Sequence, residues 1–326
     1  MMKAVSSIEL GMDTLTHKPF EELTDDEIVA HLHVQDAERV FCVYEALKRG
    51  IDHETIWKIT KIDWWFLDKM QHLADLEKGL AKCNGVLSLE QYQTAKKYGF
   101  QDKTIKRLAQ VDVLPVENYR AGFKMVDTCA AEFSANTPYF YSTYDGDNEA
   151  AEFIAAREAE AAANGQPKKK KVLVFGSGPI RIGQGIEFDY CSVHCVWTLK
   201  NHGCEAILVN NNPETVSTDF DTGDRLYFDP LNPESVDNII ATEKPDACVV
   251  QFGGQTAIKL AKHMDEIGLP ILGTPADAID EAEDRERFDE LLERCSIPRA
   301  PGRTVFNLEE ALAACLLYTS PSPRDA

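Results

Sequence analysis

From Lys171 onward, short apolar runs alternate with stretches of helical pattern, and this alternation constrains the fold more than any other feature of the 326-residue chain. The apolar runs are VLVF (172–175), AILVNNN (206–212), ACVVQFGG (247–254) and PILGT (270–274), with helical patterns at about 184–201, 233–242 and 255–267. Continuous apolar strands joined by helices are typical of a parallel sheet covered on both faces. We therefore predict an α/β unit over residues 172–284.

Each predicted strand ends in a polar or glycine-rich segment. These segments are GSGPIRIGQG, NNNPETVSTD, QFGGQT and GTPADAID. In open parallel sheets, ligands bind at the carboxyl ends of the strands. The sequence therefore predicts a functional site where these four segments meet.

The first segment invites comparison with a dinucleotide-binding turn, which needs a third small residue and an acidic residue at the end of the second strand. Gly176 and Gly178 fit, but Arg181 occupies the third position and is too bulky for close packing of helix on strand. The second strand ends in three asparagines and a proline, with no carboxylate at its tip. Both failures argue against an NAD or FAD site.

Between residues 21 and 110 the sequence shows helical spacing only, which predicts a small helical bundle. LTDDEIVAHL begins with Thr24 as an N-cap, and DAERVFCVYEALKRG ends at Gly50, a helix stop. An aromatic group, Trp57, Trp64, Trp65 and Phe66, is expected to pack in the core, with a docking surface as the alternative. The expected fold class is α + α/β, a bundle followed by a Rossmann-like parallel-sheet domain.

Charge and cysteine usage exclude several classes of protein. The net charge of −20 argues against a nucleic-acid partner, which requires a basic face. The nine cysteines form no CxxC pair, which favours free buried thiols in a reducing compartment and predicts no metal site. No signal peptide or membrane-spanning run is apparent, so we expect a cytoplasmic protein without a membrane partner.

Four long segments together resemble the large subunit of carbamoyl phosphate synthetase: GSGPIRIGQGIEFDYCSVHCVWTLK, VNNNPETVSTDFDTGDRLYF, QFGGQTAIKLA and GTPADAIDEAEDRERF. The wording NPETVSTD is similar to the start of the second synthetic half of that family. ITKIDWWFLDKM and FKMVDTCAAEFSANTPYFYSTY resemble the oligomerisation domain that joins the two halves.

The resemblance implies a division of the chain. Residues 1–150 would be the helical oligomerisation domain, its first residues ending the preceding half, and 151–171 a linker. Residues 172–284 would be the pre-ATP-grasp domain, and 285–314 the start of an ATP-grasp domain. Residues 315–326, CLLYTSPSPRDA, resemble nothing in the family and are expected to be a non-native tail.

The resemblance also implies a reaction. The family is a ligase that makes carbamoyl phosphate from bicarbonate, glutamine-derived ammonia and two ATP, and its second half phosphorylates carbamate. Arg181, Glu187 and Glu214 match positions that line the carbamate passage or its mouth. The alternative is that Glu187 forms a local cap or ion pair and that Arg181 braces the loop. Asn212 and Thr215 are expected to hold the loop.

ATP and its Mg²⁺ or Mn²⁺ ions would bind mainly in the ATP-grasp domain that follows, of which the sequence contains only the beginning. Arg285 matches an arginine that reaches ATP, with a solvent-exposed side chain as the alternative. No complete catalytic set is present, so the chain alone is expected to be inactive.

The implied partners are the rest of the large subunit, the glutaminase small subunit and further copies through the helical domain. A non-catalytic assembly module that binds a full synthetase is the alternative. The resemblance leaves open whether the product feeds arginine or pyrimidine biosynthesis.

Overall fold

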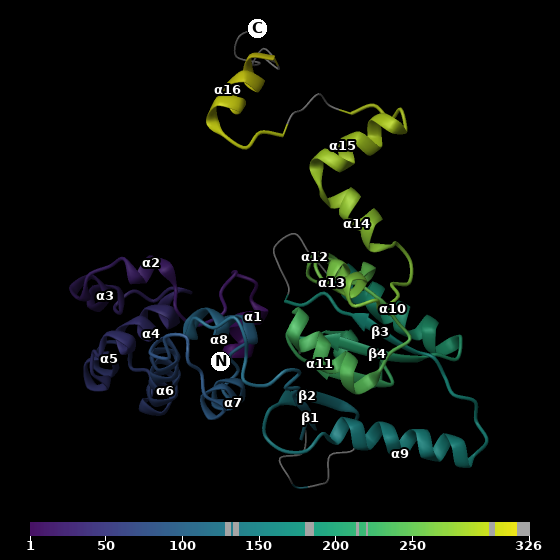
Figure 1. Cartoon of the computed structure of the whole chain (residues 1–326), viewed down its shortest axis with the longest axis horizontal. Helices are drawn as coiled ribbons and strands as arrows, with labels where there is room; N and C mark the ends of the chain where they lie inside the picture. Colours follow the sequence, from purple (N-terminus) through teal and green to yellow (C-terminus); the bar gives the residue numbers. More distant parts are fainter. Residues whose placement is uncertain are drawn as a thin grey trace.

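The computed structural model describes residues 1–127, 132, 137–179, 186–212, 215–219, 221–299 and 304–317, the side chains of 316 and 317 excepted. A helical region comes first, a six-stranded sheet with its helices follows, and three further helices lead away from the sheet (Figure 1). The predicted α + α/β class is confirmed. Within the described part, no helix is long and apolar enough to cross a membrane.

Eight helices build the helical region. They are α1 (Met2–Ser7), α2 (Lys18–Glu21), α3 (Asp25–His31), α4 (Arg39–Arg49), α5 (His53–Thr60), α6 (Trp64–Ala81), α7 (Leu89–Lys97) and α8 (Asp102–Ala109). Thr24 and Ser88 form capping boxes at the starts of α3 and α7, each satisfying backbone N–H groups of the first turn. Gly50 ends α4 at φ 87°, a left-handed conformation that glycine adopts without strain.

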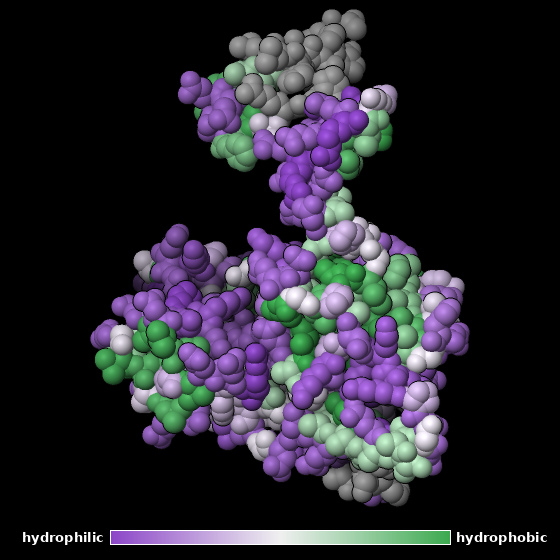
Figure 2. Space-filling model, turned by 45° about the vertical axis from the view of Figure 1, so that its right-hand side comes forward, coloured by the Kyte–Doolittle hydropathy of each residue, from purple (hydrophilic) through white to green (hydrophobic). Residues whose placement is uncertain are grey.

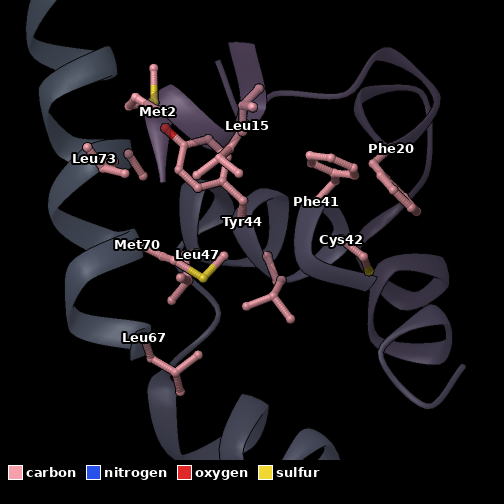
Figure 3. Close-up of a cluster of buried hydrophobic side chains, with 14 of the residues drawn as sticks. Met2, Leu15, Phe20, Phe41, Cys42, Tyr44, Leu47, Leu67, Met70 and Leu73 are labelled. Carbon is pink, nitrogen blue, oxygen red and sulfur yellow. The ribbon is translucent and has the colours of Figure 1, made fainter. Parts of the chain in front are cut away.

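The core of this region lies between α4 and α6, where Tyr44 and Leu47 meet Met70 and Leu73 (Figure 3). The hydroxyl of the fully buried Tyr44 donates to Glu77 Oε2 at 2.9 Å, so its polar end is satisfied. Burial and the Glu77 carboxylate raise the pKa of Tyr44 well above its usual value, which keeps the phenol protonated.

The expectation that the aromatic group packs in this core is wrong. Trp57, Trp64, Trp65 and Phe66 are between 38% and 59% exposed. The buried face of α6 begins only at Leu67 and continues through Met70 and Ala74. Three consecutive residues in the first turn point in different directions around a helix, so Trp64, Trp65 and Phe66 cannot all face the bundle.

The sheet has the order β1-β2-β5-β4-β3-β6, with β1 and β2 antiparallel and the other neighbours parallel. Its strands are β1 (Gly122–Met125), β2 (Tyr139–Thr143), β3 (Lys171–Phe175), β4 (Glu205–Asn210), β5 (Arg225–Phe228) and β6 (Ala247–Val249). The predicted parallel strands appear as β3, β4 and β6, each buried along its central residues. The predicted strand at 270–274 is not formed; this segment makes a single β-bridge, between Ile271 and Cys248.

Helices and short turns cover the sheet and connect its strands. They are α9 (Glu149–Ala163), α10 (Glu187–Asn201), α11 (Pro233–Glu243), α12 (Gly254–Ile258) and α13 (Ala261–Glu266), with the 3₁₀ turns η1 (Val216–Thr218) and η2 (Gln251–Gly253). Apolar side chains are buried in two separate clusters, one including Phe175 and Ile239 and the other Val174 and Val196. Adjacent β3 residues thus enter different clusters, as alternation along a strand requires.

The residues after α8 contain two strands and a long helix, within the ranges assigned from the sequence to a helical domain (1–150) and a linker (151–171). β1 and β2 extend the sheet beyond β5, and Phe123 and Phe140 are buried in the core of the α/β unit. α9 also packs there through Ala150 and Phe153. The described helical region therefore ends with α8, because pairing of β2 with β5 joins this later segment to the sheet.

Three helices follow the sheet: α14 (Ala276–Glu283), α15 (Arg285–Arg294) and α16 (Leu308–Leu317). They lead away from the sheet, and the surface of this projection is mainly hydrophilic where it leaves the sheet (Figure 1, Figure 2). No residue of α14 or α15, both fully described, is buried. Most of the expected non-native tail, 318–326, lies outside the described residues.

A buried ion cluster joins the helical region to the sheet unit. The side chain of Lys96 in α7 is fully buried and contacts Asp102 Oδ1 at 2.8 Å and Glu234 Oε1 of α11. Glu234 Oε2 also accepts a hydrogen bond from the backbone N–H of Asp102 at 2.7 Å. Two carboxylates therefore compensate one buried ammonium at this junction.

Candidate functional site at the strand ends

The first residue of the loop after β3 must be glycine, because the side chain of Asn210, the last residue of β4, occupies the space beside it. A Cβ atom on Gly176 would lie 2.5 Å from Asn210 Cγ, far inside van der Waals contact. Asn210 is fully buried, and its Oδ1 accepts a hydrogen bond from the backbone N–H of Gly178 at 3.0 Å. The asparagine side chain therefore holds this loop from the end of the neighbouring strand.

The second glycine of this loop packs against α12. Gly178 has φ 69°, and a Cβ atom there would lie 2.9 Å from Thr256 Cγ2. Gly253 approaches from the same side, since a Cβ atom on it would lie 2.5 Å from the carbonyl oxygen of Gly176. These glycines thus permit the ends of β3, β4 and β6 to approach each other closely.

Polar side chains continue from Asn210 along the segment after β4. Asn210 Nδ2 donates to Ser217 Oγ at 3.3 Å, and Ser217 Oγ lies 3.2 Å from Thr215 Oγ1. The backbone N–H of Ser217 donates to Asp189 Oδ2 of α10 at 3.2 Å. Asp189 is 3% exposed, and its Oδ1 finds no hydrogen-bond partner among the described residues. The strand ends therefore carry a connected, largely buried polar network.

Three of the site residues proposed from the sequence lie in or next to these strand-end segments and are described. Asn212 is buried immediately after β4, and Thr215 hydrogen-bonds with the η1 turn through its side chain and its carbonyl oxygen. Glu187 is the first residue of α10 and is exposed. The other two, Arg181 and Glu214, lie outside the described residues.

Arg285 is not brought together with these residues. It is the exposed first residue of α15, which follows α14 away from the sheet (Figure 1). The neighbouring Arg287 instead contacts Asp277 at 2.7 Å and also Asp280, which ties α15 to α14.

Asn210, Ser217, Asp189 and Thr256 hold these segments together but were not singled out from the sequence as site residues. Ser217 and Thr256 lie in two of the strand-end segments, NNNPETVSTD and QFGGQT. The sequence therefore indicates that their segments belong to the site, but not what each residue does. Asp189 stands in the helix that follows the first loop, where an acidic residue in a first turn is ordinary. Their importance comes from contacts across 28 or more residues of sequence.

Thiol chemistry is disfavoured next to this site. Burial raises the pKa of Cys195 in α10 to about 11 and that of Cys248 in β6 to about 12, so both thiols stay protonated near neutral pH. The expectation of buried thiols is only partly met, because Cys191 and Cys295 are exposed. Within the described residues, no group of three or more His, Cys, Asp or Glu side chains could hold a metal ion.

Comparison with known proteins identifies similarity in both regions. Residues 1–124 match the family model for the carbamoyl-phosphate synthetase large chain, oligomerisation domain, and residues 168–281 match that for the carbamoyl phosphate synthase preATP-grasp domain. Over 317 residues the chain is 51% identical to the carbamoyl phosphate synthase large chain of Agathobacter rectalis, covering 95% of this chain and 28% of that protein.

A second relative, the large chain of Lachnoclostridium phytofermentans, is 51% identical over 321 residues, covering 96% of this chain and 29% of the relative. The chain thus spans between a quarter and a third of the length of these relatives. A solved biotin carboxylase domain from Hydrogenobacter thermophilus 2-oxoglutarate carboxylase is 22% identical over 48% of this chain and 34% of that chain, with a TM-score of 0.36.

Proposed function

This chain belongs to the carbamoyl phosphate synthase large-chain family, and on that premise we propose that it is part of the ligase that phosphorylates carbamate. The full reaction would use bicarbonate, glutamine-derived ammonia and two ATP, with this chain contributing to the second synthetic half. The rest of the large chain and the glutaminase small subunit would be its partners. We place the activity in the cytoplasm.

The polar network at the strand ends is the observation that carries this proposal. It is largely buried, and it offers fixed donors and acceptors from Asn210, Ser217 and Asp189. Carbamate decomposes in water, so its transfer requires a polar conduit that excludes bulk solvent. In the proposed arrangement Arg181, Glu187 and Glu214 line this conduit, and Asn212 and Thr215 hold its wall.

We assign ATP and the Mg²⁺ or Mn²⁺ ions to the part of the large chain that this sequence does not contain. Phosphoryl transfer needs cations and metal-binding carboxylates around the phosphates. Arg285 would contribute one guanidinium donor to the nucleotide, since its exposed position at the start of α15 leaves it able to meet another domain.

The division of the chain also remains our proposal. We assign residues 1–110 to association, 122–284 to the pre-ATP-grasp unit with β1, β2 and α9 included, and 285–314 to the start of an ATP-grasp domain.

A chimera tests the proposed function. Residues 1–299 of this chain would replace the matching region of the Agathobacter rectalis large chain, and carbamoyl phosphate formation and ATP hydrolysis would be measured with glutamine and the small subunit. We expect the chimera to make carbamoyl phosphate, and Glu187→Ala to lower the yield per ATP hydrolysed several-fold. Glu54→Ala, an exposed ion-pair residue in α5, is the control.

An inactive but folded chimera, or an unchanged yield in Glu187→Ala, would contradict the proposal. In the same chimera, Arg285→Ala should raise the KM for ATP while the exposed Arg294→Ala does not. For this chain alone we expect no bicarbonate- or carbamate-stimulated ADP release in the presence of Mg²⁺. Measurable turnover would place an ATP site within the residues described above.

We propose self-association of the helical region as a second function. The observation that favours it is the exposed aromatic group of Trp57, Trp64, Trp65 and Phe66, and hydrophobic residues also gather on the surface of this region (Figure 2). Large exposed aromatic side chains are typical of interfaces between proteins. The same surface would serve a non-catalytic module that binds a full synthetase.

Sedimentation velocity of the purified chain at micromolar concentrations tests this second function. We expect oligomers that dissociate in the Trp65→Glu variant but persist in Val113→Glu, which changes an exposed apolar residue outside the aromatic group. A monomeric wild-type chain would refute self-association, and co-sedimentation with the Agathobacter rectalis large chain would then test the assembly alternative.

A further inference from the structure

The first residues of the helical region reach the end of the sheet that bears the candidate site. Lys3 of α1 donates to the carbonyl oxygen of Ser142 at 2.6 Å and contacts Asp229 Oδ1 at 2.7 Å. Ser142 lies in β2, and Asp229 directly follows β5 with a fully buried side chain. α1 is therefore tied to the carboxyl end of β5, the same edge of the sheet at which β3 and β4 end.

The turn after α1 makes a second contact at this edge. Glu9 Oε1 accepts a hydrogen bond from Thr256 Oγ1 at 2.6 Å, and Glu9 Oε2 lies 2.9 Å from Lys259 Nζ. The Glu9 side chain is only 17% exposed, and its backbone has φ 56°. A non-glycine residue in this left-handed region is uncommon, and surrounding contacts are needed to maintain it.

Thr256 connects Glu9 to the glycine loop. Its Cγ2 atom occupies the space that a side chain on Gly178 would need, and the N–H of Gly178 is held by Asn210. Gly178 in the loop after β3 is thus hydrogen-bonded by Asn210 and packs closely against Thr256. The orientation of Thr256 is set by its hydrogen bond to a carboxylate, the stronger class of hydrogen bond.

α1, which ends just before Glu9, is held by the helical core. Met2 and Val5 of α1 are buried in the same cluster as Tyr44 and Leu47 of α4. Met2 also packs closely against Gly99, because a Cβ atom on Gly99 would lie 2.9 Å from Met2 Cβ. A shift of the helical core would therefore be transmitted through α1 to Glu9.

We infer that Glu9 is a positioning residue of the strand-end site, and that it couples the helical region to the loop at Gly178 through Thr256. The role of this loop in carbamate transfer rests on the proposed function. The contacts that hold the loop do not depend on it. The inference makes the helical region part of the wall of the site, so that association of copies through that region could alter the loop.

Amide hydrogen exchange in this chain tests the inference without any assay of activity. The reporter is the Gly178 amide, followed by NMR, with the Val174 amide in the centre of β3 as the internal reference. We expect Glu9→Ala to accelerate exchange at Gly178 about tenfold or more, as loss of a charge-assisted hydrogen bond predicts, with no change at Val174. Thr256→Val, which keeps the shape and removes the hydroxyl, should have a similar effect.

The double variant decides whether the two residues act through one contact. If Glu9 acts through Thr256, the effects of Glu9→Ala and Thr256→Val are not additive. Glu9→Gln keeps an acceptor for Thr256 and should restore most of the protection. Lys259→Ala should change little, since the Lys259 side chain is 60% exposed.

Three outcomes would overturn the inference: unchanged exchange at Gly178 in Glu9→Ala, additive effects in the double variant, or no rescue by Glu9→Gln. Because the exchange assay needs no ATP, carbamate or partner subunit, its failure is distinguishable from a failure of the chimera.

Discussion

Replacing Lys96 by methionine should weaken the junction between the helical region and the sheet unit. Methionine has nearly the length of the lysine stem, so the substitution Lys96→Met removes the charge with little change in packing. It breaks the contacts with Asp102 and Glu234 and the placement of the ammonium over Tyr144, 4.9 Å from the ring centre. Two carboxylates are then left facing each other without their cation.

The expected loss of unfolding free energy is about 3 kcal/mol. Removing one partner of a buried ion pair typically costs roughly 3–5 kcal/mol. The lower end applies because the side chains of Glu234 and Asp102 are 25% and 37% exposed and can gain water after the substitution. Asp102 also keeps the hydrogen bond from Tyr92, 3.0 Å away.

The loss should be the same at pH 6, 7.5 and 9. Burial lowers the pKa of Lys96, but the negative charges of the Glu234 and Asp102 carboxylates outweigh it and hold the pKa above the ordinary lysine value. A raised folded-state pKa contributes its full stability below the unfolded pKa, and this contribution is lost only as pH rises through the folded pKa. The whole neutral range lies below both values.

Urea unfolding followed by circular dichroism measures this effect. Lys97→Met is the matched control, since Lys97 is the next residue, half exposed, and contacts Asp145 at 2.7 Å on the surface. We expect the control to resemble the wild-type chain, because exposed ion pairs contribute little. The reasoning is refuted if Lys96→Met is as stable as Lys97→Met, or if its loss changes across this pH range.

Three further substitutions or measurements test other parts of the structure. Ser88→Ala removes the capping box of α7 and should cost about 1 kcal/mol of stability in urea unfolding, with no effect if the cap is unimportant. Gly178→Ala places a Cβ atom 2.9 Å from Thr256 Cγ2 at φ 69°, and we expect a loss of about 1–2 kcal/mol, whereas a neutral result would contradict the close approach. Mass spectrometry of thiol labelling at pH 8 should show the exposed Cys191 modified rapidly and the buried Cys248, with its pKa of about 12, only after unfolding; equal rates would contradict the burial described above.

Several features of the fold could be predicted because their causes are local. Thr24 and Gly50 mark a helix start and a helix end through hydrogen bonds and backbone angles within one turn. The apolar runs at β3, β4 and β6 predict buried parallel strands, since only burial on both faces explains so continuous an apolar pattern. β5 is not predicted because RLYF is short and begins with Arg225, whose charge is compensated by Glu243 at the end of the following helix, α11.

The location of the candidate site could be predicted from the sequence, but the contacts between its residues could not. Strand-end segments must converge in a parallel sheet, so their position follows from the order of strands and helices. The sequence alone did not reveal that Asn210 and Thr256 contact the glycine loop from both sides, nor that Glu9 hydrogen-bonds with Thr256, 247 residues further along the chain. Such long-range pairs leave no periodic pattern in the sequence. Because the chain contains many polar residues, the sequence alone cannot indicate which of them pair with each other.

The sequence by itself determined the helical region, the parallel strands, the resemblance to a family and the polar character of the strand ends. These properties depend on residue type and spacing over at most a few turns of chain. Only the tertiary structure decided that β1 and β2 join the sheet and α9 packs against it, that Trp64 and Trp65 face solvent, and that Glu9 of the helical region hydrogen-bonds with Thr256 beside the glycine loop. The physical reason is that packing and ion pairing depend on which surfaces meet, and segments far apart in sequence meet only in the folded chain.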